Sequence, residues 1–306
     1  MWEAKDALLW CCNVSPLKIL WNSLRIVHSN KLVFCSILCF TTLPLSFLTF
    51  TLAISTHALR SHIYHLEAVA RAATTRVEAR HVWHESRDDA VSLLRTRALF
   101  SLLCFPLSLA AAVSAVHATA SAVQGKVAAS VVAAVRANWK RPAVTVISVY
   151  VILLAFAPVP RVLAAAFPSP WARVMVRAIG SGTEVYLMAV MSLGLVVSVA
   201  EDRVGWEAIR VGSHLMHGRR VCGWFLSALF VLVSGLINRK MEVLLEKQNS
   251  EVGVWDKTVL MCSYALVVLV SYVITTVFYC DSRRRLDIKE PIDDEIEVCI
   301  SPLSSL

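Results

Sequence analysis

Apolar residues in this chain gather into six long runs that are separated by polar segments. A helix needs about 20 mostly apolar residues to cross a hydrocarbon core of about 30 Å, and each run approaches or exceeds that length. The pattern therefore predicts an all-α, polytopic membrane helical bundle of about six transmembrane helices. The predicted spans cover residues 32–54, 98–122, 142–166, 183–201, 221–238 and 258–280.

Three juxtamembrane segments, near residues 16–31, 126–141 and 204–220, have helical periodicity and end in a basic turn before an apolar run. In the third segment, a helix places four polar residues on one arc and apolar residues on the other; the four are Glu207, Arg210, His214 and His217. A helix with that contrast, held between spans, is expected to lie in the membrane interface. The three units resemble a degenerate internal repeat, with chance similarity as the alternative.

The remaining polar segments complete the predicted organisation. Residues 1–31 form a cytoplasmic N-terminal amphipathic segment, residues 32–280 the six-helix domain, and residues 281–306 an acidic cytoplasmic tail of a composition typical of disorder. The segment 55–97 lacks glycine and proline, so we expect helix that continues beyond the bilayer.

The third predicted span is interrupted by Pro158-Val159-Pro160-Arg161. A broken span would expose backbone dipoles to a substrate, as in transporters, with Arg161 as a functional cation. Alternatively, the span ends near Ala157 and Arg161 reaches the interface along its aliphatic stem. The second interpretation is the simpler one, and both remain open at this stage.

Composition supports a membrane protein and narrows its partners. Hydrophobic residues make up 57% of the chain, charged residues 17%, and the mean hydropathy is +0.62. The net charge of +8 fits basic residues facing anionic headgroups, so we expect the lipid bilayer, and protein partners at the cytoplasmic face, but no nucleic acid. The nine cysteines include no C-x-x-C pair, which argues against a zinc module or a disulfide framework.

Histidines recur at H-x-x-H spacing in His62/His65, His81/His84 and His214/His217. That spacing places two imidazoles on one helix face, as a metal site requires. Because further ligands are not regularly placed, a solvated stripe is the preferred interpretation, and we predict no metal and no cofactor.

No catalytic constellation stands out, so we expect a non-enzymatic integral membrane protein that organises lipids or partner proteins. One alternative is a transporter or channel subunit that uses Arg161, Glu184 or Glu201. A second is a lipid-modifying enzyme with Glu201, Asp202, His214 and His217 as acid–base groups. The candidate functional or topological residues are Arg161, Glu201, Glu207, Arg210, His214, His217, Arg219 and Arg220, and the candidate palmitoylation sites are Cys11, Cys12 and Cys280.

Several stretches resemble a large plant family of multi-pass membrane proteins of unknown function. They are Ile19-Leu20-Trp21 through Asn30-Lys31, Trp139-Lys140-Arg141, Val197 to Glu201 with Ala208-Ile209-Arg210, His217 to Arg220, and Thr276-Val277-Phe278-Tyr279. The 184–238 region and the Thr-x-x-Tyr ending are also similar to bacterial membrane domains that can be fused to glycerophosphodiester phosphodiesterases. The resemblance implies six helices in an endomembrane or the plasma membrane of a plant, and it transfers no catalytic residue.

Basic residues predict the orientation. The N-terminal segment, 123–141, 202–220 and the tail hold sixteen Lys and Arg, whereas 55–97, 168–181 and 239–258 hold thirteen. Since the sixteen lie in short segments beside spans, where the positive-inside rule applies best, we predict that both termini are cytoplasmic.

The orientation can be tested at the sequon Asn13-Val14-Ser15. If both termini are cytoplasmic, the lumenal glycosylation machinery never reaches Asn13, and the protein migrates without a glycan. A sequon introduced into 55–97 should be glycosylated. An endoglycosidase-sensitive shift that Asn13→Gln abolishes would contradict this orientation.

Overall fold

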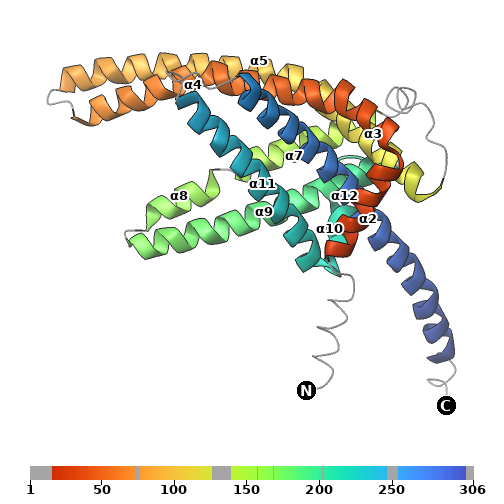
Figure 1. The fold of residues 1–306 in the computed structure, drawn as a ribbon. Helices are drawn as coiled ribbons and strands as arrows, with labels where there is room; N and C mark the ends of the chain where they lie inside the picture. The colour runs from red at the N-terminus through yellow and green to blue at the C-terminus, as the bar shows by residue number, and fades with distance from the viewer. Residues whose placement is uncertain are drawn as a thin grey trace. The chain divides into compact units, whose positions relative to one another are not determined.

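The computed structural model describes residues 16–72, 76–125, 139–156, 158–167, 169–201, 203–246 and 254–300, and these contain helices and no strand. The predicted all-helical class is therefore confirmed. Clustering of contacts divides the chain into unit 1 (residues 1–34, 112–232 and 270–306) and unit 2 (residues 35–111 and 233–269). Three long helices, α5 (Arg76–Val123), α11 (Arg220–Glu246) and α12 (Val254–Ile300), contribute residues to both units (Figure 1).

Five stretches are long and apolar enough to cross a membrane, and they agree with five of the predicted spans. They are Lys31–Leu66, Ser86–Val123, Pro170–Ala200, Arg220–Leu245 and Trp255–Leu286. The first of them joins α3 (Lys31–Ile37), a π-helical segment (Leu38–Thr42) and α4 (Leu43–Ala72). The predicted helical continuation through 55–97 is confirmed for its described residues by α4 and α5.

The predicted third span, residues 142–166, is wrong as a single helix. The structure has α7 (Lys140–Phe156) of 17 residues and a separate α8 (Val159–Ala166) of 8 residues. Proline explains the break: Pro158 and Pro160 stand at the start of α8, where a missing N–H costs nothing, whereas inside a continuous helix each would remove a hydrogen bond. Among the described residues, α7 falls short of the length of the five candidate spans.

The fourth predicted span is longer than expected because α9 runs from Pro170 to Ala200 instead of beginning near residue 183. Ser169 precedes it in extended conformation, and Pro170 occupies the first turn. Helix α8 packs along α9 (Figure 1). The approach is close at Gly180, where an added Cβ would lie 2.6 Å from Cβ of Pro160.

The predicted amphipathic helix 204–218 is present as α10 (Trp206–His217), but its apolar face does not face lipid. Ala208, Ile209, Leu215 and Met216 are all buried, and α10 packs against α9. A Cβ added to Gly212 would lie only 2.8 Å from the backbone nitrogen of Gly194. The two glycines therefore let the α9 and α10 backbones approach closely, as small residues do in membrane bundles.

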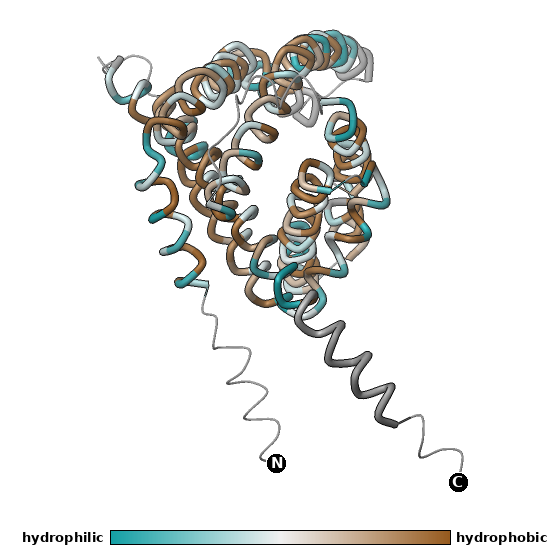
Figure 2. The backbone as a smooth tube through the Cα atoms, turned by 90° about the vertical axis from the view of Figure 1, so that its right-hand side faces the viewer, coloured by the Kyte–Doolittle hydropathy of each residue, from teal (hydrophilic) through white to brown (hydrophobic). Residues whose placement is uncertain are grey.

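The first predicted amphipathic segment is helical over its described residues, as α2 (Pro16–Ser29). Its alternation of hydrophilic and hydrophobic residues is visible in Figure 2, next to the N-terminal trace. Ile19 and Ser23 are buried, and the Ser23 hydroxyl donates to the Ile19 carbonyl at 2.8 Å. Leu17, Trp21 and Leu24 remain exposed, so protein covers this helix at Ile19 and Ser23 and leaves these three apolar side chains uncovered.

Unit 2 is held by packing in the first third of α4 and by polar contacts further along this helix. Phe50 meets Tyr264 edge-on at 5.9 Å between ring centroids, beside buried Met241 and Leu245. His62 lies 2.7 Å from Asp89, joining α4 to α5.

The tail predicted to be disordered from residue 281 is helical up to Ile300, as the continuation of α12. Two further groups of predictions lie outside the described residues. The first is the amphipathic helix near 126–141, of which residues 126–138 are not described. The second is the set of predictions for Cys11, Cys12 and Asn13.

The contact between α9 and α10 predicts the effect of Gly212→Ala. Because the new methyl group meets backbone atoms of Gly194 and Leu193, the helices must move apart, and overpacking of this kind costs about 1–3 kcal/mol. Thermal unfolding of the purified protein in detergent measures the loss. Gly182→Ala on α9 is the matched control, since nothing lies within 4 Å of its added Cβ; equal stability of the two variants would contradict the contact.

Candidate functional site

The polar residues at the end of α9 are joined to α12 by a hydrogen bond. Tyr279 donates from its hydroxyl to Oε1 of Glu201 at 2.6 Å, and Nε of Arg283 lies 3.6 Å from the same oxygen. The Glu201 side chain is only 20% exposed. A partly buried carboxylate is stable only when it is paired, and both partners come from a segment that is far away in the sequence.

A second ion pair lies beside the first and joins the turn between α10 and α11 to α12. Arg219 donates from Nη1 to Oδ2 of Asp281, which also lies 3.6 Å from Nε of Arg285. The guanidinium of Arg219 stands over the Phe278 ring, 5.2 Å from its centroid, as in cation–π contacts. We call these residues the Glu201 cluster: Glu201, Arg219, Tyr279, Asp281, Arg283 and Arg285.

The chain between Glu201 and α10 is fixed by α7. Gly205, just before α10, has φ of +58°, a value that L side chains avoid and glycine adopts without strain. Its N–H donates to Oγ1 of Thr145 on α7 at 3.0 Å, in a buried setting. Arg203 pairs with Glu207 in the first turn of α10. The start of α7, the end of α9 and the start of α10 therefore meet at one end of unit 1.

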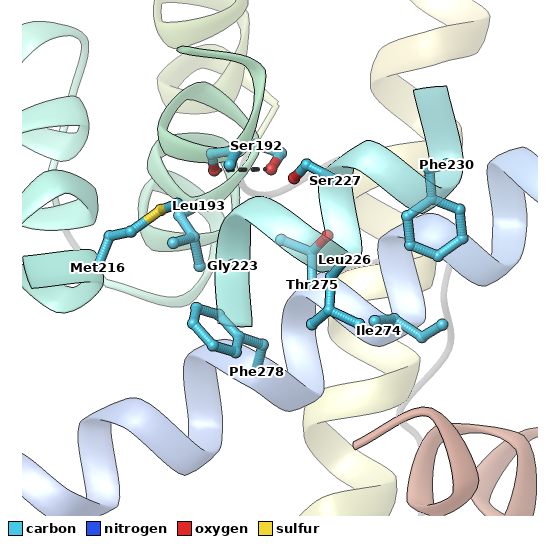
Figure 3. Close-up of a pocket in the computed structure, with 11 residues that line it drawn as sticks. Ser192, Leu193, Met216, Gly223, Leu226, Ser227, Phe230, Ile274, Thr275 and Phe278 are labelled. Carbon is cyan, nitrogen blue, oxygen red and sulfur yellow. Dashed lines mark hydrogen bonds between the residues drawn. The ribbon is translucent and has the colours of Figure 1, made fainter. Parts of the chain in front are cut away.

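A small, partly open cavity of about 20 Å³ lies between α9, α10, α11 and α12. Leu193, Met216, Leu226, Ile274 and Phe278 supply much of the apolar lining, and Phe278 also supports Arg219 of the cluster. Three hydroxyl groups, those of Ser192, Ser227 and Thr275, come from three different helices (Figure 3).

The residues predicted from sequence separate into two groups. Glu201 and Arg219 belong to the cluster, whereas Glu207, Arg210, His214, His217 and Arg220 are exposed. Glu184 is exposed on α9, and Cys280 is half-buried in α12 beside Tyr279. Asp202 and the side chain of Arg161 in α8 lie outside the described residues. Among the described residues, Glu201 is paired with Tyr279 and Arg283, and neither His214 nor His217 is hydrogen-bonded or ion-paired to it. No group of three potential metal ligands occurs among the described residues.

Sequence analysis missed the partners of Glu201 and Arg219, namely Tyr279, Asp281, Arg283 and Arg285. The available signal was a carboxylate at the end of one apolar run and a tyrosine with three arginines at the end of another. It also missed the three cavity hydroxyls, because single Ser and Thr residues are common inside apolar runs.

The tie between α9 and α12 predicts that Tyr279→Phe is destabilising. The change removes only the hydroxyl that donates to Glu201, and hydrogen bonds to charged groups contribute about 1.5–3 kcal/mol. Chemical or thermal unfolding in detergent measures the difference. Tyr150→Phe, at an exposed position of α7, is the matched control and should change stability by less than about 0.5 kcal/mol; a Tyr279→Phe variant as stable as this control would contradict the tie.

Comparison with known proteins gives one match. No curated protein and no solved structure matches the chain. A family model described as a domain of unknown function (DUF8558) matches residues 13–303, which include every helix among the described residues. The chain therefore belongs to the DUF8558 family of proteins of unknown function.

Proposed function

We propose that this protein is a non-enzymatic integral membrane protein that gathers anionic lipids around one end of unit 1. This end, which we call the basic end, carries nine described basic side chains: Lys140, Arg141, Arg203, Arg210, Arg219, Arg220, Arg283, Arg284 and Arg285. Only three carboxylates are described there, Glu201, Glu207 and Asp281; in the sequence, Asp202 and the acidic tail from residue 287 on adjoin this end. The excess of positive charge among the described side chains, from Lys140 to Arg285, is the observation that carries the proposal.

Pairing within the basic end leaves that excess in place. Each of the three carboxylates has an arginine partner within the end itself. Arg210, Arg220 and Arg284 are exposed and extend the charge beyond these pairs. Basic side chains near an anionic leaflet contribute about 1 kcal/mol each, so the end should attract phosphate-bearing or carboxylate-bearing headgroups from the surrounding bilayer.

Helix directions support placing this end on the cytoplasmic side. The starts of α7 and α10 and the end of α9 are joined at Thr145 and Gly205, and the start of α11 is joined to α12 at Asp281. The pair α7 and α9 and the pair α11 and α12 thus each leave this end and return to it, and the positive-inside rule favours the cytoplasmic side for an end so rich in arginine. From the sequence resemblance alone, we also propose a plant endomembrane or plasma membrane as the location, with further protein partners on the cytoplasmic face.

Transport is the second candidate function, and the break between α7 and α8 favours it. Broken helices in transporters present backbone dipoles to substrates, and Arg161 lies in the short helix that follows the break. Loss of solute flux through proteoliposomes on Arg161→Ala, with the fold intact, would favour transport over lipid organisation. If Arg161→Ala leaves the flux unchanged, or if the unmodified protein shows no flux, lipid organisation remains the better account.

The lipid proposal is tested by Arg220→Gln combined with Arg284→Gln. Both side chains are exposed, and neither belongs to the Glu201 cluster, so the fold should remain intact. We expect the enrichment of anionic over zwitterionic lipid that copurifies with the protein to fall several-fold, and to fall in the unmodified protein as salt rises. Quantitative lipid mass spectrometry after mild detergent extraction measures it.

The matched control for that experiment is Arg95→Gln combined with Arg97→Gln, which removes the same charge from exposed positions of α5 in unit 2. These changes should leave the enrichment almost unchanged. Equal loss in the two double variants would show that net charge, rather than the basic end, attracts the lipids, and no enrichment in the unmodified protein would overturn the proposal.

A further inference from the structure

The cavity of unit 1 has a polar character that its apolar helices do not require. Ser192 donates its proton to the Ala189 carbonyl at 2.9 Å, and Thr275 donates to the Ser271 carbonyl at 2.8 Å. A hydroxyl has one proton and two lone pairs. The hydroxyl protons of Ser192 and Thr275 are therefore used in hydrogen bonds within their own helices, and a ligand finds only acceptor oxygens there.

Ser227 on α11 completes the polar part of the cavity. Within the described part of the chain its hydroxyl has no hydrogen-bond partner, so it can donate as well as accept. Figure 3 shows the side chains of Ser192, Ser227 and Thr275 on the walls contributed by α9, α11 and α12. The cavity thus presents more acceptors than donors, and it suits a ligand that carries a hydroxyl proton.

Charge is absent from the described lining of the cavity. Its α9 wall, at Ala189 to Leu193, lies seven to eleven residues before the end of that helix at Ala200, which is about 10–17 Å at 1.5 Å per residue. A charged headgroup at that depth would be costly without a partner. The position and the lining both select an uncharged polar group.

We propose that this cavity binds the hydroxyl end of an uncharged lipid alcohol. The hydroxyl donates to the acceptor oxygens of Ser192 or Thr275 and accepts from Ser227, while Leu193, Leu226 and Ile274 surround the adjoining carbon atoms. The rest of the lipid leaves through the open side of the cavity. The cavity volume of about 20 Å³ is enough for a group the size of one water molecule, so the cavity admits the hydroxyl group and the rest of the lipid lies outside it.

The site is distinct from the basic end proposed to gather anionic lipids. Phe278 belongs to the cavity wall on one side and supports the Arg219 guanidinium on the other. Anionic headgroups and the lipid alcohol would therefore occupy separate places, and each proposal can fail without the other.

Photocrosslinking of the full-length protein in nanodiscs tests the inference. The probes are a diazirine-bearing diacylglycerol and a diazirine-bearing sterol, which distinguish the two main sources of a lipid hydroxyl. Their matched controls are the corresponding triacylglycerol and sterol ester, which lack the hydroxyl. We expect one of the alcohols to label peptides from α9, α11 or α12 that line the cavity, in competition with its unlabelled form, and its ester to label them at least fivefold less.

Two variants of Ser227 separate the roles of shape and hydrogen bonding. Ser227→Leu fills the cavity and should abolish the specific labelling. Ser227→Ala keeps the space but removes the donor, and we expect labelling to fall roughly two- to tenfold, as for the loss of one hydrogen bond. Gly235→Leu on the same helix is the control, because nothing lies within 4 Å of its added Cβ, and it should label like the unmodified protein.

Three results with the alcohol probes would overturn the inference. They are equal labelling of the lining by alcohol and ester, absence of labelling by both alcohols, and retention of full labelling in folded Ser227→Leu protein. Labelling of the lining by a phosphatidylserine probe in preference to both alcohols would also overturn it. None of these outcomes alters the lipid enrichment measured at Arg220 and Arg284.

Discussion

The hydrogen bond from Tyr279 to Glu201 joins the end of α9 to α12, and the arrangement of unit 1 depends on it. A carboxylate at the end of an apolar helix loses much of its hydration, so it has to be neutralised by a nearby partner. Glu201 accepts a hydrogen bond from the Tyr279 hydroxyl and is ion-paired with Arg283, and both partners lie on α12. In the same way, the neighbouring ion pair of Arg219 and Asp281 joins the turn between α10 and α11 to α12. Together they fix three helix ends against one another.

That fixed end lies beside two further features of the unit. It holds α10 against α9, where Gly194 and Gly212 allow close backbone contact, so a helix with a polar outer arc becomes part of the folded core. Next to this end, the cavity lies between α9, α11 and α12 at the level of Ser192, Ser227 and Thr275. Phe278 contacts the charged Arg219 of the Glu201 cluster, and it also lines the cavity, whose polar groups are neutral hydroxyls.

Much of this fold could be predicted from the sequence, because five of the apolar runs are long enough to identify spans directly. The polar arc of α10 was also predictable, since Glu207, Arg210 and His214 recur at helical spacing. The sequence could not predict what covers the opposite, apolar arc. Protein and lipid are equally apolar, so helical periodicity does not distinguish between them. The third span was misjudged where Pro158 and Pro160 start a new helix.

The site was less accessible to sequence analysis than the spans. Glu201 and Arg219 could be selected because they stand at span ends, but Tyr279 lies 78 residues after Glu201. Helix packing decides which two span ends lie next to each other, and no local sequence pattern indicates this pairing. The cavity hydroxyls have the same origin: each is an ordinary residue in its own helix, and only the packing of three helices gives them a shared position.

The central claim is that the unmodified protein prefers anionic lipid at its boundary, and electron spin resonance of spin-labelled lipids measures this most directly. The protein would be reconstituted in bilayers containing either a spin-labelled phosphatidylserine or a spin-labelled phosphatidylcholine, and the motionally restricted fraction compared. We expect a larger restricted fraction for phosphatidylserine, decreasing as salt rises. Equal fractions for the two lipids at low salt would contradict the account.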